Sequence, residues 1–284
     1  MAPVIEQSWN FSDYERAFKK GYEYLLRGES YQFDLTGRFL FSFSEGTTPT
    51  DLAHALWKGT PGPAPYAHMS ILGETGICFL SNSPECLFQL RGQKGKTWIE
   101  TMPIKGTVQC SGTKEDIDRA WKELSNSEKN EAELFMITDL MKNDLYRISK
   151  NPVEVIKKKV PLLVPGLIHQ YSRLRSPLSA SISLLELMSI IFPGGSVVGA
   201  PKKRTMEILH EIENSPRGFY CGSTLILHGS LRRASLNIRT AEINLISRLF
   251  TYGAGGGITL LSDVHDEYQE TLNKRDSFIQ LLCR

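Results

Sequence analysis

The chain has 284 residues, of which 41% are hydrophobic and 23% charged, a balance typical of an ordinary globular protein and not of a disordered or fibrous one. Lys and Arg total 33 against 31 Asp and Glu, and the formal net charge of +2 gives no reason to expect nucleic acid or a membrane as a partner. Five cysteines without C-x-x-C spacing argue against a disulfide framework or a zinc site. Because neither a signal peptide nor a membrane-spanning apolar run is found, we expect a cytoplasmic protein.

The N-terminal part of the sequence predicts a helix followed by strands. The helix begins at Ser12, which forms a capping-box pattern with Glu15, and it stops at Gly28. Apolar and polar residues then alternate in residues 31–43, as in a half-buried strand. Further strands, joined by Gly-containing turns, are predicted within residues 71–92 and 97–109.

The remaining elements follow in blocks. Lys114–Lys150 is rich in charge, with apolar residues at helical intervals, and predicts a helical hairpin. A helix is expected to begin at Ser183 and another at Pro201, and Asp263 is expected to cap the last helix. Three strands are predicted between the last two helices, in residues 219–229, 235–245 and 248–255. This order favours an α+β fold over repeated βαβ units.

The last predicted helix carries an acidic and basic face. Glu267 and Glu270 are three residues apart, and Glu270 and Lys274 are four apart, so all three project from one side. On an isolated helix this pattern is typical of a solvated face with an ion pair. Four glycines in residues 253–257 come just before it, however, and they allow the backbone to approach an anion and donate its N–H groups.

Glu133 lies at the edge of an apolar face in the second helix of the predicted hairpin. Such a residue is usually only a boundary residue. If Glu133 meets Glu267 and Glu270 in space, three converging carboxylates repel one another unless a hard cation joins them. Mg²⁺ is the natural candidate for that cation.

Two further residues are candidates for chemistry. Lys105, in the P-I-K-G-T segment at residues 103–107, either extends its amine to solvent or is a desolvated neutral amine that acts as a nucleophile or base. Glu85, in S-P-E at residues 83–85, is a general acid only if its surroundings are apolar enough to keep it protonated. Neither pattern decides the question alone.

Taken together and in this order, these segments resemble the chorismate-utilising enzyme family, which includes anthranilate synthase component I, aminodeoxychorismate synthase component I, isochorismate synthase and salicylate synthase. The matching stretches run from about Gly28 to Lys274, and they are GESYQFDLTGRF, SNSPECLF, PIKGT, AELFMITDLMKNDL, GLIHQYS, FPGGSVVGAPKKRTMEI, RGFYCG, LNIRTAEI and GAGGGITLLSDVHDEYQETLNK. The resemblance implies a single chorismate-binding catalytic domain over residues 1–284. That domain would be α+β, with two stacked, mostly antiparallel sheets, helices packed outside and a deep magnesium-dependent pocket.

The resemblance also implies roles for residues near the reacting carbons. Lys105 is the expected nucleophile at C2 of chorismate, and Glu85 is the acid that protonates the departing C4 hydroxyl. His169 matches the family histidine near that hydroxyl, although a purely structural histidine is an equal alternative. Gly106 and Thr107 follow the nucleophile and are expected to shape the pocket.

A second group of residues is implied to hold the metal and the substrate carboxylates. Glu133 and Glu270 are the expected magnesium ligands, and Glu267 is expected to bind the metal directly or through water. The residues expected to bind the enolpyruvyl carboxylate are Tyr220, Arg239, Lys274, Gly256 and Gly257.

The residue inside P-I-x-G-T separates the branches of the family. Lys105 favours the lysine-type aminodeoxychorismate synthases, which aminate chorismate at C4 with ammonia from a glutamine amidotransferase subunit, component II, toward p-aminobenzoate and folate. Anthranilate synthase, an isochorismate or salicylate synthase, and a non-catalytic chorismate-binding subunit remain alternatives. We expect the chain to lack the tryptophan-binding segment that longer relatives carry before the G-x-x-Y-Q region. We therefore expect the sheet edge near residues 31–43 to be covered in another way.

Overall fold

The computed structural model describes residues 3–58, 62–93, 95–164, 166–178, 182–213 and 215–283. By its contacts the chain divides into two compact units. The first unit comprises Met1–Pro84, Val197–Gly222 and Asn237–Arg284, and the second comprises Glu85–Ser196 and Ser223–Leu236. The expectation of one catalytic domain stays a prediction.

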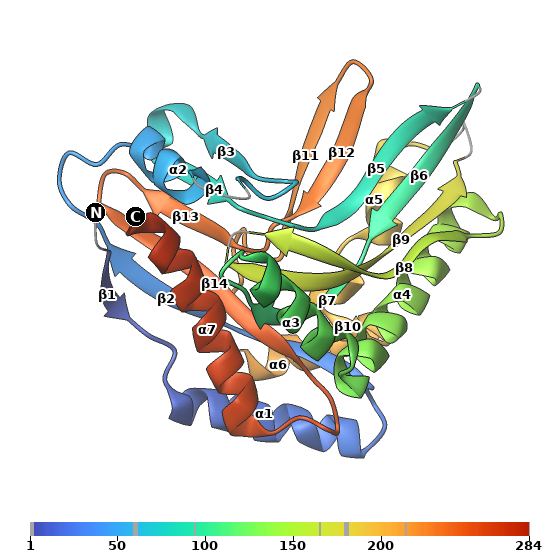
Figure 1. Cartoon of the computed structure of the whole chain (residues 1–284), viewed down its shortest axis with the longest axis horizontal. Helices are drawn as coiled ribbons and strands as arrows, with labels where there is room; N and C mark the ends of the chain where they lie inside the picture. The colour runs from blue at the N-terminus through green and yellow to red at the C-terminus, as the bar shows by residue number, and fades with distance from the viewer. Residues whose placement is uncertain are drawn as a thin grey trace. The chain divides into compact units, whose positions relative to one another are not determined.

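An antiparallel sheet forms the first unit, with strand order β1-β2-β14-β13-β4-β3 and with β10 also paired to β2. Its strands are β1 (Val4–Gln7), β2 (Gln32–Ser42), β3 (His68–Ile71), β4 (Ile77–Ser81), β10 (Gly199–Ala200), β13 (Thr240–Asn244) and β14 (Leu249–Ile258). Its helices are α1 (Phe11–Leu26), α2 (Pro49–Trp57), α6 (Lys202–Ile212) and α7 (Val264–Leu282), with a short 3₁₀ turn at Gly73–Thr75. Figure 1 shows α7, in red, running beside the orange strand β14.

The start of α1 differs from the prediction. Asn10, not Ser12, is the N-cap, because its side chain accepts a hydrogen bond from the Asp13 backbone N–H at 2.9 Å. Ser12 therefore lies inside the first turn, and the capping-box prediction was wrong. The predicted stop is confirmed, since Gly28 has a left-handed φ of 71° directly after the Arg27 cap.

Two apolar clusters fill the first unit. One lies beneath α2 and α7 and contains Phe39, Phe41, Leu80, Phe250, Tyr252 and Phe278. The other is formed by α1 and α6 on β2, and contains Tyr14, Phe18, Phe33, Leu35, Ile208 and Ile258. Because helices and neighbouring segments cover both faces of β2 over residues 32–37, the expected half-buried strand is instead fully buried there.

The outer edge of β2, opposite β14, is covered in three ways. β1 pairs with its C-terminal end and β10 with its N-terminal end. Between them, the side chain of Glu213 accepts hydrogen bonds from the Thr36 N–H at 3.0 Å and the Thr36 hydroxyl at 2.9 Å. The sheet edge that the sequence left open is therefore occupied by short strands and a carboxylate.

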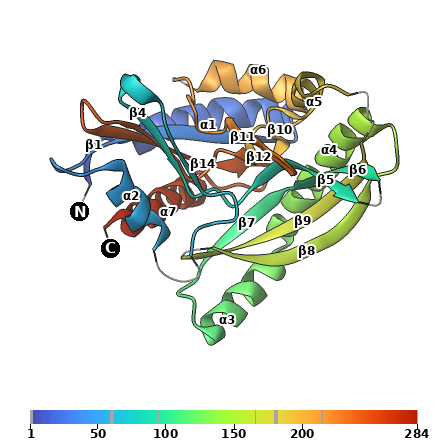
Figure 2. The ribbon, with the colours of Figure 1, turned by 90° about the horizontal axis from the view of Figure 1, so that it is seen from above.

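The second unit contains another antiparallel sheet, in which β11, β12, β5 and β6 are adjacent in that order and β9 pairs with β6, β7 and β8. Its strands are β5 (Cys86–Gln93), β6 (Lys96–Met102), β7 (Ile104–Gln109), β8 (Glu154–Val164), β9 (Leu167–Pro177), β11 (Ser223–His228) and β12 (Leu231–Leu236). Its helices are α3 (Lys114–Ser125), α4 (Glu128–Ser149) and α5 (Leu184–Ile191). A short 3₁₀ turn spans Gly195–Val197. Figure 2 shows α4 beside β9, against which it packs.

The α+β class is confirmed, as are the helical hairpin and the Asp263 cap, whose side chain accepts from the N–H groups of His265 and Asp266. One strand prediction was wrong, because residues 235–245 contain the end of β12 and, separately, β13. Asn237–Arg239 interrupts them, and Arg239 has a left-handed φ of 53° that ends regular pairing. Among the described residues, no helix is long and apolar enough to cross a membrane.

Candidate active site

Lys105 lies on β7 in the second unit and is only 8% exposed. A β-bulge follows it, because Lys105 pairs with Gln170 and Thr107 pairs with His169, which leaves Gly106 between them. Gly106 has a φ of 78°, and a Cβ there would lie 2.8 Å from Leu124. Both the positive φ and the lack of room for a Cβ therefore favour glycine at this position of P-I-K-G-T. The bulge also fixes the direction of the side chains on either side.

His169, on β9, is buried and contacts the same segment. Its Nδ1 atom lies 3.2 Å from the Gly106 carbonyl oxygen and 3.1 Å from Thr107 Oγ1. The carbonyl oxygen only accepts hydrogen bonds, so we assign the ring proton to Nδ1. In the neutral ring Nε2 is then the basic nitrogen.

Glu85 precedes β5 and is 4% exposed. Its Oε1 accepts a hydrogen bond of 2.5 Å from the Ser196 hydroxyl. A buried carboxyl held in place by a hydroxyl donor suits a general acid.

Glu133 is buried on α4, which packs on β7 and β9. One turn earlier, the backbone carbonyl of Asn130 accepts a hydrogen bond of 2.6 Å from Gln170, the register partner of Lys105. The second unit thus contains Lys105, Glu85, Glu133 and His169, all of them buried. Buried ionisable side chains are candidates for a functional site.

The α7 residues lie in the first unit against the glycines of β14. Glu267 is 2% exposed, and its Oε1 accepts a 2.6 Å hydrogen bond from the Ser262 hydroxyl. Lys274 pairs with Glu270 at 2.7 Å and donates to the Gly255 carbonyl at 2.8 Å. The predicted common face of the three residues is therefore directed partly at the strand and is not a purely solvated surface.

Gly255 and Gly256 of β14 make room for neighbouring atoms. A Cβ at Gly256 would lie 3.3 Å from Glu267 Oε2 and 3.9 Å from Lys274 Nζ, so both charged groups approach bare backbone there. A Cβ at Gly255 would lie 2.1 Å from the Leu35 carbonyl of the neighbouring strand. Gly257, also in this strand, pairs with Asp34 of β2.

Tyr220 and Arg239 also belong to the first unit. A Cβ at Gly253 would lie 2.3 Å from the Tyr220 ring, so this glycine allows the ring to lie against β14. Burial raises the pKa of the Tyr220 hydroxyl well above its ordinary value, so the group stays a neutral donor. Arg239 Nη1 donates to Ser277 Oγ at 2.6 Å, whereas its buried Nη2 has no hydrogen-bond partner among the described residues. That nitrogen is suited to donate to a ligand carboxylate.

The carboxylates expected to bind Mg²⁺ are divided between the units, Glu133 in the second and Glu267 with Glu270 in the first. Within the described ranges, no group of three or more His, Cys, Asp or Glu side chains is arranged to hold a metal ion. Two carboxylates one helical turn apart nevertheless supply hard oxygen donors. Since Mg²⁺ in proteins is commonly held by one or two carboxylates together with waters and substrate, the α7 pair fits it.

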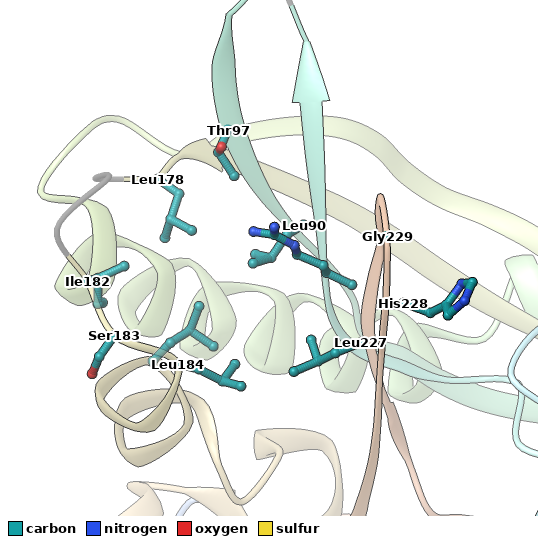
Figure 3. A pocket seen from close by; sticks show the side chains of 11 residues that line it. Leu90, Thr97, Leu178, Ile182, Ser183, Leu184, Leu227, His228 and Gly229 are labelled. Atoms are coloured by element: carbon teal, nitrogen blue, oxygen red, sulfur yellow. The ribbon is translucent and has the colours of Figure 1, made fainter.

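A separate cavity of about 440 Å³ lies within the second unit, between α5 and the β5 and β12 strands. Figure 3 shows its leucine-rich wall, to which Leu90, Leu178, Leu184 and Leu227 contribute. None of the residues expected to take part in chemistry lines it. We therefore do not assign the reaction to this cavity.

Several contacts could not be found from sequence. Ser196, which donates to Glu85, lies 111 positions after it, and nothing in the spacing joins the two. Gln170 follows the predicted His169 directly, but its contact with α4 depends on the packing of a helix on β9. In both cases the only sequence signal is a polar residue in an otherwise apolar segment.

Comparison with known proteins identifies the class. A family model described as chorismate binding enzyme matches residues 2–280, and the chain therefore belongs to the chorismate-binding enzyme family. Aminodeoxychorismate synthase component 1 of Escherichia coli is 34% identical over 273 residues, which are 95% of this chain and 57% of that protein. A protein named anthranilate synthase component 1 1, from Haloarcula marismortui, is 35% identical over 253 residues, 89% of this chain and 50% of that protein.

Among solved structures, anthranilate synthase component I from Streptococcus pneumoniae matches with a TM-score of 0.83 and 26% identity, over 98% of this chain and 60% of that one. The chain thus spans about half the length of the two curated relatives described. The names of these relatives give two different activities, so the comparison shows the family but not the reaction.

Proposed function

We propose that the chain acts as an aminodeoxychorismate synthase component I, which converts chorismate and ammonia to 4-amino-4-deoxychorismate. The observation that carries the proposal is Lys105, a buried lysine on a bulged strand in the same unit as buried Glu85 and His169. A lysine is seldom buried to this extent, so its place here suits a chemical role. The relatives named aminodeoxychorismate synthase component 1 support this choice.

Lys105 is the nucleophile in this proposal. Its neutral amine adds to C2 of chorismate, the two conjugated ring double bonds both shift, and the C4 hydroxyl leaves as water. Ammonia then adds at C4, both double bonds shift back, and Lys105 is released from C2 as the neutral amine. A lysine adds to carbon only as the neutral amine, and a site with little water favours that form.

Glu85 and His169 move the protons. Glu85 protonates the departing C4 hydroxyl, while Ser196 holds Oε1. His169, protonated at Nδ1 by our assignment, presents Nε2 as the base that takes a proton from the ammonium formed at C4. Glu85 thus acts while the C4 hydroxyl leaves, and His169 acts after ammonia has added at C4.

The substrate carboxylates are bound by the remaining residues. Arg239 Nη2 and Tyr220 donate to the enolpyruvyl carboxylate, aided by Lys274 and by the backbone N–H groups of Gly256 and Gly257. Glu133, Glu267 and Glu270 would hold Mg²⁺, which when bound neutralises negative charge at the C1 carboxylate. Dicarboxylate binding by fixed cations and donors orients the ring for attack at C2.

A separate glutamine amidotransferase, component II, is proposed as the source of ammonia and as the partner of this chain. The word component in the names of the relatives supports that partner. The product would serve p-aminobenzoate and folate synthesis.

Anthranilate synthase is the second candidate, favoured by the relatives from Haloarcula marismortui and Streptococcus pneumoniae. Identification of the product by mass separates the candidates. Chorismate with ammonium and magnesium is expected to give 4-amino-4-deoxychorismate, with little product when either ammonium or magnesium is left out. Anthranilate or isochorismate as main product would contradict the proposal, and no turnover at all would favour a non-catalytic subunit.

A further inference from the structure

Tyr14 is a fully buried residue of α1 with an unusual hydroxyl. Its side chain is 0% exposed, and the hydroxyl oxygen has no hydrogen-bond partner within the described ranges. Leaving a buried hydroxyl unpaired is destabilising, and phenylalanine would fill the same space without that penalty. The hydroxyl is therefore expected to find a partner in a state that includes a ligand or ordered water.

The ring of Tyr14 is directed to α7 of the same unit. It packs on the ring of Tyr268 with centroids 5.1 Å apart, and on Trp9 with centroids 5.0 Å apart. Tyr268 is fixed in turn, because its hydroxyl donates to the Trp9 carbonyl at 2.9 Å. Tyr268 is the residue after Glu267, so the ring of Tyr14 packs against the N-terminal turns of α7, the part of the helix that carries Glu267 and Glu270.

The acidic turn also acts electrostatically on Tyr14. Burial, and then the charges of Glu267 and Glu270, raise the pKa of the Tyr14 hydroxyl well above its ordinary value. The group therefore remains protonated and can donate a hydrogen bond. Glu267 is otherwise held at Oε1 by Ser262, while its Oε2 faces Gly256.

We propose that Tyr14 is a positioning residue for the Glu267–Glu270 pair: its hydroxyl donates, directly or through one ordered water, to a carboxylate oxygen when the pair holds a divalent cation. This inference rests on the magnesium site of the proposed function but not on which product is formed. A hydroxyl in this position orients a metal-binding carboxylate without touching the cation. Hydrogen-bond partners of metal ligands commonly act in this way. Tyr14 itself touches neither metal nor substrate.

The test compares Tyr14→Phe with Tyr24→Phe, which removes a hydroxyl from the same helix. The Tyr24 hydroxyl is exposed and donates to Glu211 at 2.6 Å, far from the acidic turn in sequence. Binding of Mn²⁺ is measured by titration calorimetry, and the melting temperature is measured in EDTA. Tyr14→Phe is expected to weaken Mn²⁺ binding by about 10-fold while leaving the metal-free melting temperature unchanged or higher. Tyr24→Phe is expected to leave Mn²⁺ binding unchanged.

Equal Mn²⁺ affinity in Tyr14→Phe and the wild type would overturn the inference, and so would a lower metal-free melting temperature with unchanged affinity. A wild-type protein that binds no Mn²⁺ would overturn it together with the magnesium site. Formation of anthranilate by a wild type that binds Mn²⁺ more tightly than Tyr14→Phe would support the role of Tyr14 while refuting the proposed product. The two proposals can therefore fail separately.

Discussion

His169 and Thr107 are joined across two strands: the Nδ1 atom of His169 lies 3.1 Å from Thr107 Oγ1, directly after the bulge at Gly106. The same nitrogen lies 3.2 Å from the Gly106 carbonyl. These contacts fix the plane and the tautomer of the ring from the residues that follow the proposed nucleophile. The histidine and the lysine are consequently oriented by one local structure.

Thr107→Val tests this orientation. Valine keeps the branched shape but removes the hydroxyl, so the ring is held by a single contact and kcat is expected to fall about 10-fold with a smaller change in KM. Thr107→Ser retains the hydroxyl and is expected to keep most of the activity. Steady-state kinetics with chorismate and ammonium measures both. Equal loss in the two variants would assign the effect to packing of the methyl group instead.

Lys105→Ala is expected to abolish amination at C4, because the covalent route requires the amine. Some anthranilate is expected in its place, since the pocket still binds chorismate and admits ammonia at C2. Lys157→Ala is the matched control, since Lys157 lies on β8 of the same sheet and its Nζ donates to the Tyr171 hydroxyl at 3.0 Å. The products are identified by mass. Unchanged amination in Lys105→Ala would exclude Lys105 as the nucleophile.

Glu85→Gln is expected to lower kcat by about 10²- to 10⁴-fold, the range usual for removal of a general acid. The amide keeps the size of the side chain and can still accept from Ser196, so the fold is expected to remain intact. Ser196→Ala removes only the donor and is expected to have a smaller effect on kcat. A fall in Ser196→Ala as large as in Glu85→Gln would show that the hydroxyl, not the carboxyl, is the decisive group.

Two adjacent glycines of β14 are expected to respond differently to alanine. Gly255→Ala places a Cβ 2.1 Å from the Leu35 carbonyl, a backbone atom that cannot move without breaking strand pairing. It is expected to destabilise the protein by about 1–3 kcal/mol. Gly256→Ala meets Glu267 Oε2 at 3.3 Å, so it is expected to weaken chorismate or metal binding with little loss of stability. Urea unfolding and KM for chorismate separate the two effects, and equal stability losses would contradict the assignment of Gly256 to the site.

Local patterns predicted the elements that depend on local interactions. The helical hairpin and the Asp263 cap are set by residues within a few positions of each other, and both were found. Ser12 failed as a cap because Asn10, two residues earlier, offered an equally good acceptor, a choice that nearby sequence does not decide. β8 and β9, which no pattern predicted, form a long antiparallel pair whose strands are stabilised by pairing with each other and with β7.

For the candidate site, the residue types and their order indicated the chemistry, but the partners came only from the fold. Lys105 and Glu85 were both candidates on sequence, and both are buried. The hydrogen bond of Ser196 to Glu85 and the ring contact of Tyr14 with Tyr268 join residues more than 100 positions apart, so no periodicity can reveal them. Long-range packing, not local propensity, determines those contacts.

The ion pair of Glu213 and Arg217 provides a test of how the edge of β2 is stabilised. Arg217 donates to Glu213 at 2.7 and 2.8 Å, and the two side chains are only 18% and 9% exposed. Glu213→Gln leaves the buried guanidinium of Arg217 without its carboxylate. Because Glu213 also accepts hydrogen bonds from the N–H and hydroxyl of Thr36, the substitution weakens the cover of β2 as well.

A loss of about 3–5 kcal/mol in the free energy of unfolding is expected for Glu213→Gln, because breaking a buried pair leaves an uncompensated charge. Glu207→Gln, in the exposed pair of Glu207 with Arg204 on α6, is the matched control and is expected to cost less than about 1 kcal/mol. Urea denaturation measures both variants. Similar losses in the two would mean that the Glu213 carboxylate contributes no more than a surface charge, and that the edge of β2 is held by β1 and β10 alone.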